Sequence, residues 1–116
     1  MTTLQDYATY REIKSQPEAW AQALVEVARI KSMPRAEEYE QVIFTGCGST
    51  YYLSLAAAAL YQELTGRAAR AVPASELLLN PKTVVRDGIS QLLVAISRSG
   101  TTTETVKATE KFKEEK

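Results

Sequence analysis

The 116-residue sequence contains no histidine, which excludes several kinds of active site from this chain. A Ser-His-Asp triad, a Cys-His pair and a histidine-based zinc site each require an imidazole ring. Cys47 is the single cysteine, so the chain can form no internal disulfide, and one thiolate alone cannot hold a metal ion. We therefore expect neither a metal site nor a cofactor, and a reducing compartment such as the cytoplasm.

The sequence also lacks an excess of either charge and lacks a long apolar run. Lys and Arg together number 14, as do Asp and Glu, so the formal net charge is zero. This balance gives no global field that would attract nucleic acid or an anionic membrane. The longest apolar stretch, residues 53–61, is too short to span a bilayer, and the polar N-terminus does not resemble a signal peptide. We expect no nucleic-acid partner and no membrane location, and any anion binding must be local.

The N-terminal part of the chain predicts one helix. Ser15 and Glu18 have the spacing of a capping box, with Pro17 tolerated in the first turn. Apolar residues then recur at helical spacing until Pro34, so we expect this helix to end near Met33. The polar residues that follow are expected to form a solvated connector or a short extra turn.

After this helix, strand-like and helix-like segments alternate. The expected strands are short β-branched or apolar runs at residues 41–45, 67–73 and 90–97. The expected helices lie at residues 49–64, with Gly66 after the last turn, from Ser75 to Asn80, and at residues 101–116. This order predicts an α/β fold in three layers, with a parallel sheet and helices on both faces. Three strands are few for such a sheet, so we expect the first part of a longer protein.

Two loops rich in glycine and hydroxyl side chains each separate an expected strand from an expected helix. The first loop is TGCGST at residues 45–50, and the second loop is SRSGTTTET at residues 97–105. In a parallel α/β sheet, ligands bind beyond the carboxyl ends of the strands, where the strand order reverses. If the second strand lies on the far side of the first, the two loops flank one crevice.

The composition of both loops suits a phosphate group. A helix N-terminus presents free N–H groups and a partial positive charge, and glycine lets the backbone approach a ligand. The loop hydroxyls add donors without net charge, and Arg98 can add a positive charge. These hydroxyls belong to Ser49, Thr50, Ser97, Ser99, Thr101 and Thr102, and the loop glycines are Gly46, Gly48 and Gly100. The alternative interpretation is that both loops are ordinary helix caps.

Two common nucleotide fingerprints are missing from these loops. Tyr51 occupies the position of the third glycine in G-x-G-x-x-G, and no G-K-[ST] follows a glycine-rich loop. The sequence therefore does not predict a dinucleotide site or an ATP-type phosphate loop.

The two loops resemble the phosphosugar-binding signature of the sugar isomerase (SIS) domain family, and AVPASELLLNP at residues 71–81 is similar to the spacer between them. The stretch YREIKSQPEAW resembles the lead-in of double-SIS proteins, which include the tagatose-6-phosphate ketose/aldose isomerase group and the isomerase half of glucosamine-6-phosphate synthase. Arg98 fits the first group better. The resemblance implies a partial flavodoxin-like SIS fold, with a lead-in helix in residues 1–36 and the first part of an SIS domain in residues 37–116.

By position, the resemblance implies that Ser97, Ser99 and Thr102 contact the phosphate of a phosphorylated sugar, with Arg98 assisting. In the first loop, Thr50 would contact the phosphate and Ser49 would face the sugar. The family usually reads Gly-Thr-Ser where this chain reads Gly-Ser-Thr, which leaves the assignment between these two hydroxyls open. Cys47 is expected to pack under the loop rather than act as a nucleophile, because no base accompanies it.

The resemblance implies phosphosugar binding as part of an aldose/ketose isomerase or an amino-sugar-phosphate deaminase. The general base and the ring-opening group are expected outside these residues, and the catalytic residues are unknown, so the 116-residue chain alone would be inactive. Glu76 and Glu104 are instead explained as first-turn helix carboxylates. A non-catalytic sugar-phosphate sensor and a purely structural, dimerising module are the alternatives. We also expect a homo-oligomer, because a sheet edge and apolar helix faces would otherwise stay exposed.

Overall fold

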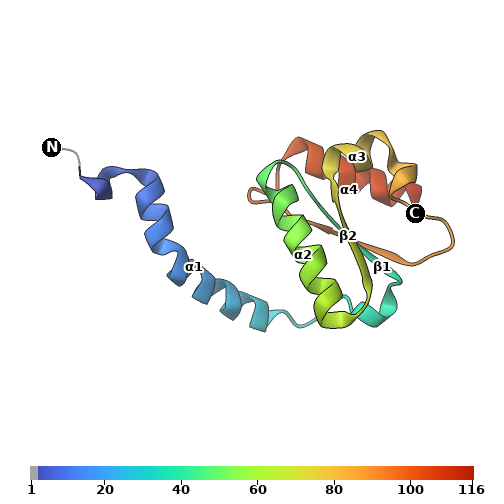
Figure 1. The fold of residues 1–116 in the computed structure, drawn as a ribbon, viewed down its shortest axis with the longest axis horizontal. Coiled ribbons are helices and arrows are strands. Elements are labelled where there is room, and N and C mark those ends of the chain that lie inside the picture. The colour runs from blue at the N-terminus through green and yellow to red at the C-terminus, as the bar shows by residue number, and fades with distance from the viewer. Residues whose placement is uncertain (1–2) are drawn as a thin grey trace. The chain divides into compact units, whose positions relative to one another are not determined.

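The computed structural model describes residues 3–116. These residues divide at Pro34 into two compact units, the second of which runs from Arg35 to Lys116. The first unit contains a short 3-10 turn, η1 (Leu4–Asp6), and one long helix, α1 (Ala8–Arg29). The second unit contains the sheet and the remaining helices (Figure 1).

The predicted start of the first helix is wrong. Ser15 lies inside α1, where its hydroxyl donates to the backbone oxygen of Glu12 at 2.9 Å, and Pro17 also lies inside the helix. The residues from Ala8 onward include good helix formers, and a proline removes one backbone hydrogen bond of a helix that continues on both sides. The acidic partner of a capping box is Asp6, whose carboxylate accepts the backbone N–H of Thr3 at 2.7 Å.

The predicted end of the same helix is also wrong, by about one turn. The last helical residue is Arg29, and Ile30 has extended backbone angles, φ −68° and ψ 116°. A proline disfavours helical angles in the residue before it, and here the non-helical backbone extends further back from Pro34 than Met33. Arg29 places a positive charge at the carboxyl end of the helix, where it interacts favourably with the helix dipole.

The second unit is built on a parallel sheet of three strands in the order β2-β1-β3. The strands are β1 (Gln41–Gly46), β2 (Ala68–Pro73) and β3 (Gln91–Ala95). The predicted α/β class with a parallel sheet is confirmed, and β2 lies on the far side of β1 from β3. β3 is shorter than the predicted segment 90–97, because the chain leaves the ladder after the N–H of Ile96 bonds to the oxygen of Thr45 at 2.8 Å.

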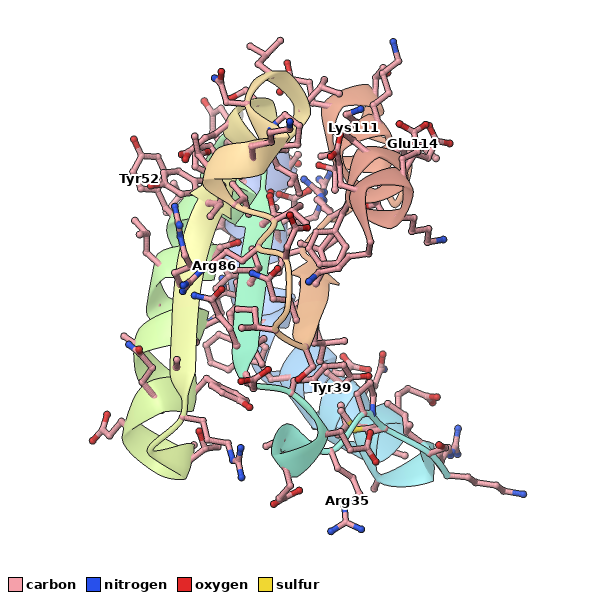
Figure 2. All side chains as sticks on the ribbon, turned by 90° about the vertical axis from the view of Figure 1, so that its right-hand side faces the viewer. Arg35, Tyr39, Tyr52, Arg86, Lys111 and Glu114 are labelled. Atoms are coloured by element: carbon pink, nitrogen blue, oxygen red, sulfur yellow. The ribbon has the colours of Figure 1, made fainter. Side chains whose placement is uncertain are left out.

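Helices cover both faces of this sheet. Helix α2 (Ser49–Thr65) packs on β1 and β2, whereas α3 (Ala74–Leu79) packs against α4 (Thr103–Glu115). Figure 2 shows α2 on one side of the strands and α4 on the other. Gly66 ends α2 with φ 67°, as predicted, since glycine adopts this left-handed conformation without a Cβ clash. Two short 3-10 turns, η2 (Ala36–Glu38) and η3 (Pro81–Thr83), complete the unit.

The main core lies between the sheet and the α3–α4 face. It consists of buried residues from the strands, both helices and the segment after η3, namely Ile43, Val72, Ala74, Leu77, Val84, Val85, Ala108 and Phe112. The opposite face of the sheet has a smaller core, because Ser54 and Ala58 are the only buried residues of α2. Its outer surface exposes large apolar side chains such as Leu53 (56%) and Leu60 (54%).

A buried glutamine ties the start of β3 to its surroundings. Gln91 donates its side-chain NH₂ to the side chain of Gln41 at 2.7 Å and to the backbone oxygen of Val84 at 3.0 Å, and it accepts the N–H of Arg86 at 2.9 Å. These bonds satisfy a polar group that would be costly to bury alone. Among residues 3–116, no helix is both long and apolar enough to cross a membrane.

Candidate functional site

The first loop leaves the carboxyl end of β1 and leads directly into α2. Thr45 is buried, and its hydroxyl donates to the backbone oxygen of Val72 at 2.8 Å, which fixes the end of β1 against β2. Gly48 has φ 59° and ψ −124°, backbone angles that a residue with a Cβ rarely adopts. The chain therefore turns sharply at Gly48, and Ser49 is exposed as the first residue of α2.

The hydroxyl of Thr50 closes this loop on itself. It accepts the backbone N–H of Cys47 at 2.9 Å and donates to the backbone oxygen of the same residue at 2.9 Å. Both functions of the hydroxyl thus hold the loop in shape. To donate to a ligand, the Thr50 hydroxyl would have to give up its hydrogen bond to the backbone oxygen of Cys47.

The second loop is held by its serine hydroxyls. The backbone N–H of Gly100 donates to the Ser97 hydroxyl at 3.0 Å, and both the N–H and the hydroxyl of Thr101 donate to Ser99 at 3.1 Å. A serine that accepts these bonds keeps its own O–H hydrogen for another partner. Ser97 is half-buried and Ser99 is exposed. The two serines can therefore order the loop and still donate to a ligand.

The remaining predicted residues of the second loop lie where the chain enters α4. Arg98 and Thr102 are both exposed, and Thr102 is the residue that precedes the first helical residue. Gly100 has φ 71°, which again favours glycine. Helix α4 begins at Thr103, two residues after the predicted start at Thr101, so its N-terminus directly follows the loop hydroxyls.

A side-chain contact joins the two loops. The thiol of Cys47 donates to a carboxylate oxygen of Glu104, with a sulfur–oxygen distance of 2.8 Å between residues 57 positions apart in the sequence. The hydrogen bond to Glu104, burial and the negative charge of that carboxylate together raise the pKa of the Cys47 thiol. The strand order thus brings the first and second loops to the same end of the sheet, where they touch.

Sequence reasoning did not find this contact. It placed Glu104 in the first turn of α4, which is where the structure has it, but assigned the carboxylate to the helix dipole alone. No local spacing links the two residues. The usable signal is topological, because each residue follows the carboxyl end of one of two neighbouring strands.

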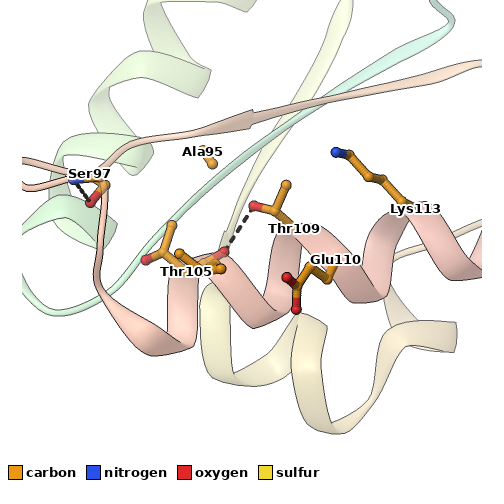
Figure 3. Close-up of a pocket in the computed structure, with 8 residues that line it drawn as sticks. Ala95, Ser97, Thr105, Thr109, Glu110 and Lys113 are labelled. Carbon is orange, nitrogen blue, oxygen red and sulfur yellow. Dashed lines mark hydrogen bonds between the residues drawn. The ribbon is translucent and has the colours of Figure 1, made fainter.

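The second loop also borders a hollow of about 380 Å³ between β3 and α4 (Figure 3). Its lining comprises Ala95, Ser97, Gly100, Thr105, Val106, Thr109, Glu110 and Lys113, without any residue of the first loop. Thr105 is buried, and its Oγ1 has no hydrogen-bond partner. The neighbouring hydroxyl of Thr109 donates to the backbone oxygen of Thr105 at 2.9 Å. Thr105 and Thr109 were not singled out from the sequence as site residues.

The other carboxylate considered from the sequence lies in a different setting. Glu76 is in the first turn of α3, accepts the hydroxyl of Thr83 at 3.1 Å and forms an ion pair with Arg70 at 3.6 Å. These contacts explain the residue without a catalytic role. In the part of the chain that the structure describes, no group of three or more His, Cys, Asp or Glu side chains could hold a metal ion.

Comparisons with known proteins give one family model, curated relatives and a similar solved structure. The family model for the SIS domain matches residues 37–116. D-galactosamine-6-phosphate deaminase AgaS from Escherichia coli, and its counterpart from strain O157:H7, are each 29% identical over 109 residues, which covers 88% of this chain and 28% of theirs. The crystal structure of tagatose-6-phosphate ketose/aldose isomerase from Escherichia coli superposes with a TM-score of 0.86 at 26% identity, covering 98% of this chain and 33% of that one.

The chain therefore spans about a third of the length of these relatives. The matched region includes the whole parallel sheet, both loops and the helices on each face. From these findings together, the chain belongs to the SIS domain family.

Proposed function

We propose that this chain binds the phosphate group of a phosphorylated sugar between its two hydroxyl loops. The observation that carries the proposal is the Cys47–Glu104 contact, because it brings two loops that are distant in sequence to a common edge of the sheet. Each loop supplies hydroxyl groups and each leads into a helix N-terminus, where partly positive N–H groups attract an anion. The two loops thus provide hydrogen-bond donors for a phosphate group in a protein with no net charge.

In this proposal the loop residues have different tasks. Ser97, Ser99 and Thr102 contact the phosphate, with Arg98 assisting, and Ser49 faces the sugar. The bonds that Thr50 makes to Cys47 support a role in shaping the first loop, whereas the predicted contact of Thr50 with phosphate stays a prediction. Gly46, Gly48 and Gly100 give the two loops their backbone path.

We further propose that the longer protein is a sugar-phosphate isomerase or an amino-sugar-phosphate deaminase. The named relatives, an amino-sugar-phosphate deaminase and a ketose/aldose isomerase, support this class. Residues 1–36 would be the lead-in helix and residues 37–116 the first part of the SIS domain. This segment would contribute the phosphate handle, whose binding energy holds the reacting carbons in place, and not the reacting groups.

Removing the serine hydroxyls of the second loop tests the proposal. We expect the Ser97→Ala/Ser99→Ala variant to bind glucosamine 6-phosphate at least about tenfold more weakly by calorimetry, because hydrogen bonds to a charged group contribute roughly 1.5–3 kcal/mol each. Ser15→Ala, a hydroxyl in α1, serves as the matched control and should bind like the wild type. Equal affinity of the double variant and the control would rule out this site.

A further inference from the structure

The Cys47–Glu104 contact connects a rigid loop to the start of a helix. The backbone N–H and the backbone oxygen of Cys47 are both bonded to the Thr50 hydroxyl, so the residue that carries the thiol has little freedom. Thr50 in turn belongs to α2, and its backbone oxygen accepts the hydroxyl of buried Ser54 at 2.8 Å. The backbone position of Cys47, and with it the base of its thiol side chain, is thus held by hydrogen bonds.

The partner in this contact carries the only charge of the pair. Glu104 lies in the first turn of α4, and its side chain is exposed. Its carboxylate oxygen nevertheless lies 2.8 Å from the sulfur in the first loop. A neutral thiol that donates and an ionised carboxylate that accepts form a charge-assisted hydrogen bond, which is stronger than a bond between two neutral groups.

Closer to the sheet, the residue that precedes the second loop is bonded to the first residue of the first loop. There the N–H of Ile96 donates to the oxygen of Thr45 at 2.8 Å, which continues the pairing of β1 with β3. Beyond this bond the two segments separate and lead into α2 and α4, and the Cys47–Glu104 hydrogen bond joins them again. The spacing between the loops is therefore set by a backbone bond at the base and by this side-chain bond above it.

We propose that the hydrogen bond from the Cys47 thiol to Glu104 is a clasp that holds the two loops at the spacing required to bind a sugar phosphate. The proposal rests on the proposed function. Cys47 and Glu104 are positioning residues in this account, since they act on the ligand through the loops that they join. Loss of either partner frees the start of α4 from the first loop and weakens binding at both loops together.

The clasp can be tested on the whole 116-residue chain without a ligand. Cys47 is the single cysteine, so alkylation by iodoacetamide reports on this thiol alone. We expect Glu104→Ala to accelerate alkylation at pH 8 several-fold, because the carboxylate no longer stabilises the protonated thiol. Lys107→Ala, an exposed change one turn along α4, is the control and should leave the rate unchanged. An unchanged rate in Glu104→Ala means that the contact does not form, and it overturns the proposal.

The effect on binding is tested by a double-mutant cycle with glucosamine 6-phosphate. We expect Cys47→Ala to weaken binding by about two- to tenfold, the effect of one lost hydrogen bond, and to have no effect when Glu104 is already alanine. Cys47→Ser keeps a donor and should restore most of the affinity. A loss that is the same in both backgrounds, or an unchanged affinity, overturns the proposal, provided that circular dichroism shows each variant to be folded.

The two proposals can fail separately. If the wild type binds no sugar phosphate, the proposed function and the clasp's role in it fall together, whatever the alkylation rates. If the wild type binds and Ser97→Ala/Ser99→Ala abolishes binding while the cycle shows no coupling, the proposed function stands and the clasp alone is overturned.

Discussion

Gly46 lies directly against Thr50. A Cβ added at Gly46 would stand 2.6 Å from both the backbone carbon and the Oγ1 of Thr50 and 2.7 Å from its backbone oxygen. Two of these three atoms are backbone atoms of α2, so they cannot move aside as the end of a flexible side chain could. The close approach lets the Thr50 hydroxyl reach both backbone groups of Cys47.

We therefore expect Gly46→Ala to destabilise the protein by about 1–3 kcal/mol, the usual effect of overpacking a filled site. Gly66→Ala is the matched control, because a Cβ there meets no atom within 4 Å and only the left-handed backbone, with φ 67° and ψ 11°, is unfavourable, by roughly 1–2 kcal/mol. Urea unfolding of both variants measures the difference. Gly46→Ala should also weaken phosphosugar binding, and a variant as stable as the wild type would contradict the close contact.

The Cys47 thiol predicts a dependence of stability on pH. Its hydrogen bond to Glu104 raises its pKa in the folded protein above the ordinary value of 9.0. A raised folded pKa contributes stability that is present below the unfolded pKa and is lost as the pH rises through the folded value. We expect the stability difference between the wild type and Cys47→Ser, measured by urea unfolding, to decline from pH 8 to pH 10. A difference that does not vary over this range would argue against the bond.

Phe112 is the large aromatic anchor of α4 in the core. It is 8% exposed and packs in the cluster that contains Leu77 and Val84. We expect Phe112→Ala to lower the free energy of unfolding by about 3–5 kcal/mol, as for other large-to-small core substitutions. Lys113→Ala, at the exposed neighbouring position, should change it by less than about 0.5 kcal/mol. Chemical denaturation followed by circular dichroism would show a loss of less than 1 kcal/mol at Phe112 if α4 does not depend on this side chain.

The outer face of α2 predicts self-association through a second copy of the chain. Tyr52, Leu53, Leu60 and Leu64 are each more than half exposed there, and Glu63 is the one charged residue of the helix. A helix that is apolar on all sides is usually covered. We expect sedimentation to show dimers or larger species for the wild type and a shift toward monomer for Leu53→Glu/Leu60→Glu. A monomeric wild type with a cooperative thermal transition would contradict this prediction.

The sheet and its flanking helices could be predicted because their signals are local. Gln41–Gly46 is a β-branched and aromatic run that ends at glycine, and the alternation of such runs with helical patterns admits few topologies. The strand order β2-β1-β3 was stated as a condition for a shared crevice, and the structure has that order. The loops could be located for the same reason, since each follows a strand.

The misses arose where one local pattern fits two structures. Pro17 with Ser15 and Glu18 reads as a helix start, yet a helix of 22 residues continues through the proline. The roles of single hydroxyls were also ambiguous, because a threonine in a turn can bond to a ligand or to its own loop, as Thr50 does. The Cys47–Glu104 contact depends on tertiary structure and on side-chain rotamers, which no spacing rule encodes.

β3 stands at the margin of the sheet and pairs with β1 on one side. Its sequence, QLLVA, contains none of the lysines, prolines or bulges with which proteins usually guard such a margin. Leu92, Leu93 and Val94 remain half-buried there, and Leu92 and Leu93 line a second hollow together with Phe112 and Lys113 of α4. The sheet could consequently be extended at β3. An added strand would form backbone hydrogen bonds with β3 and would pack on apolar side chains that are already half-buried.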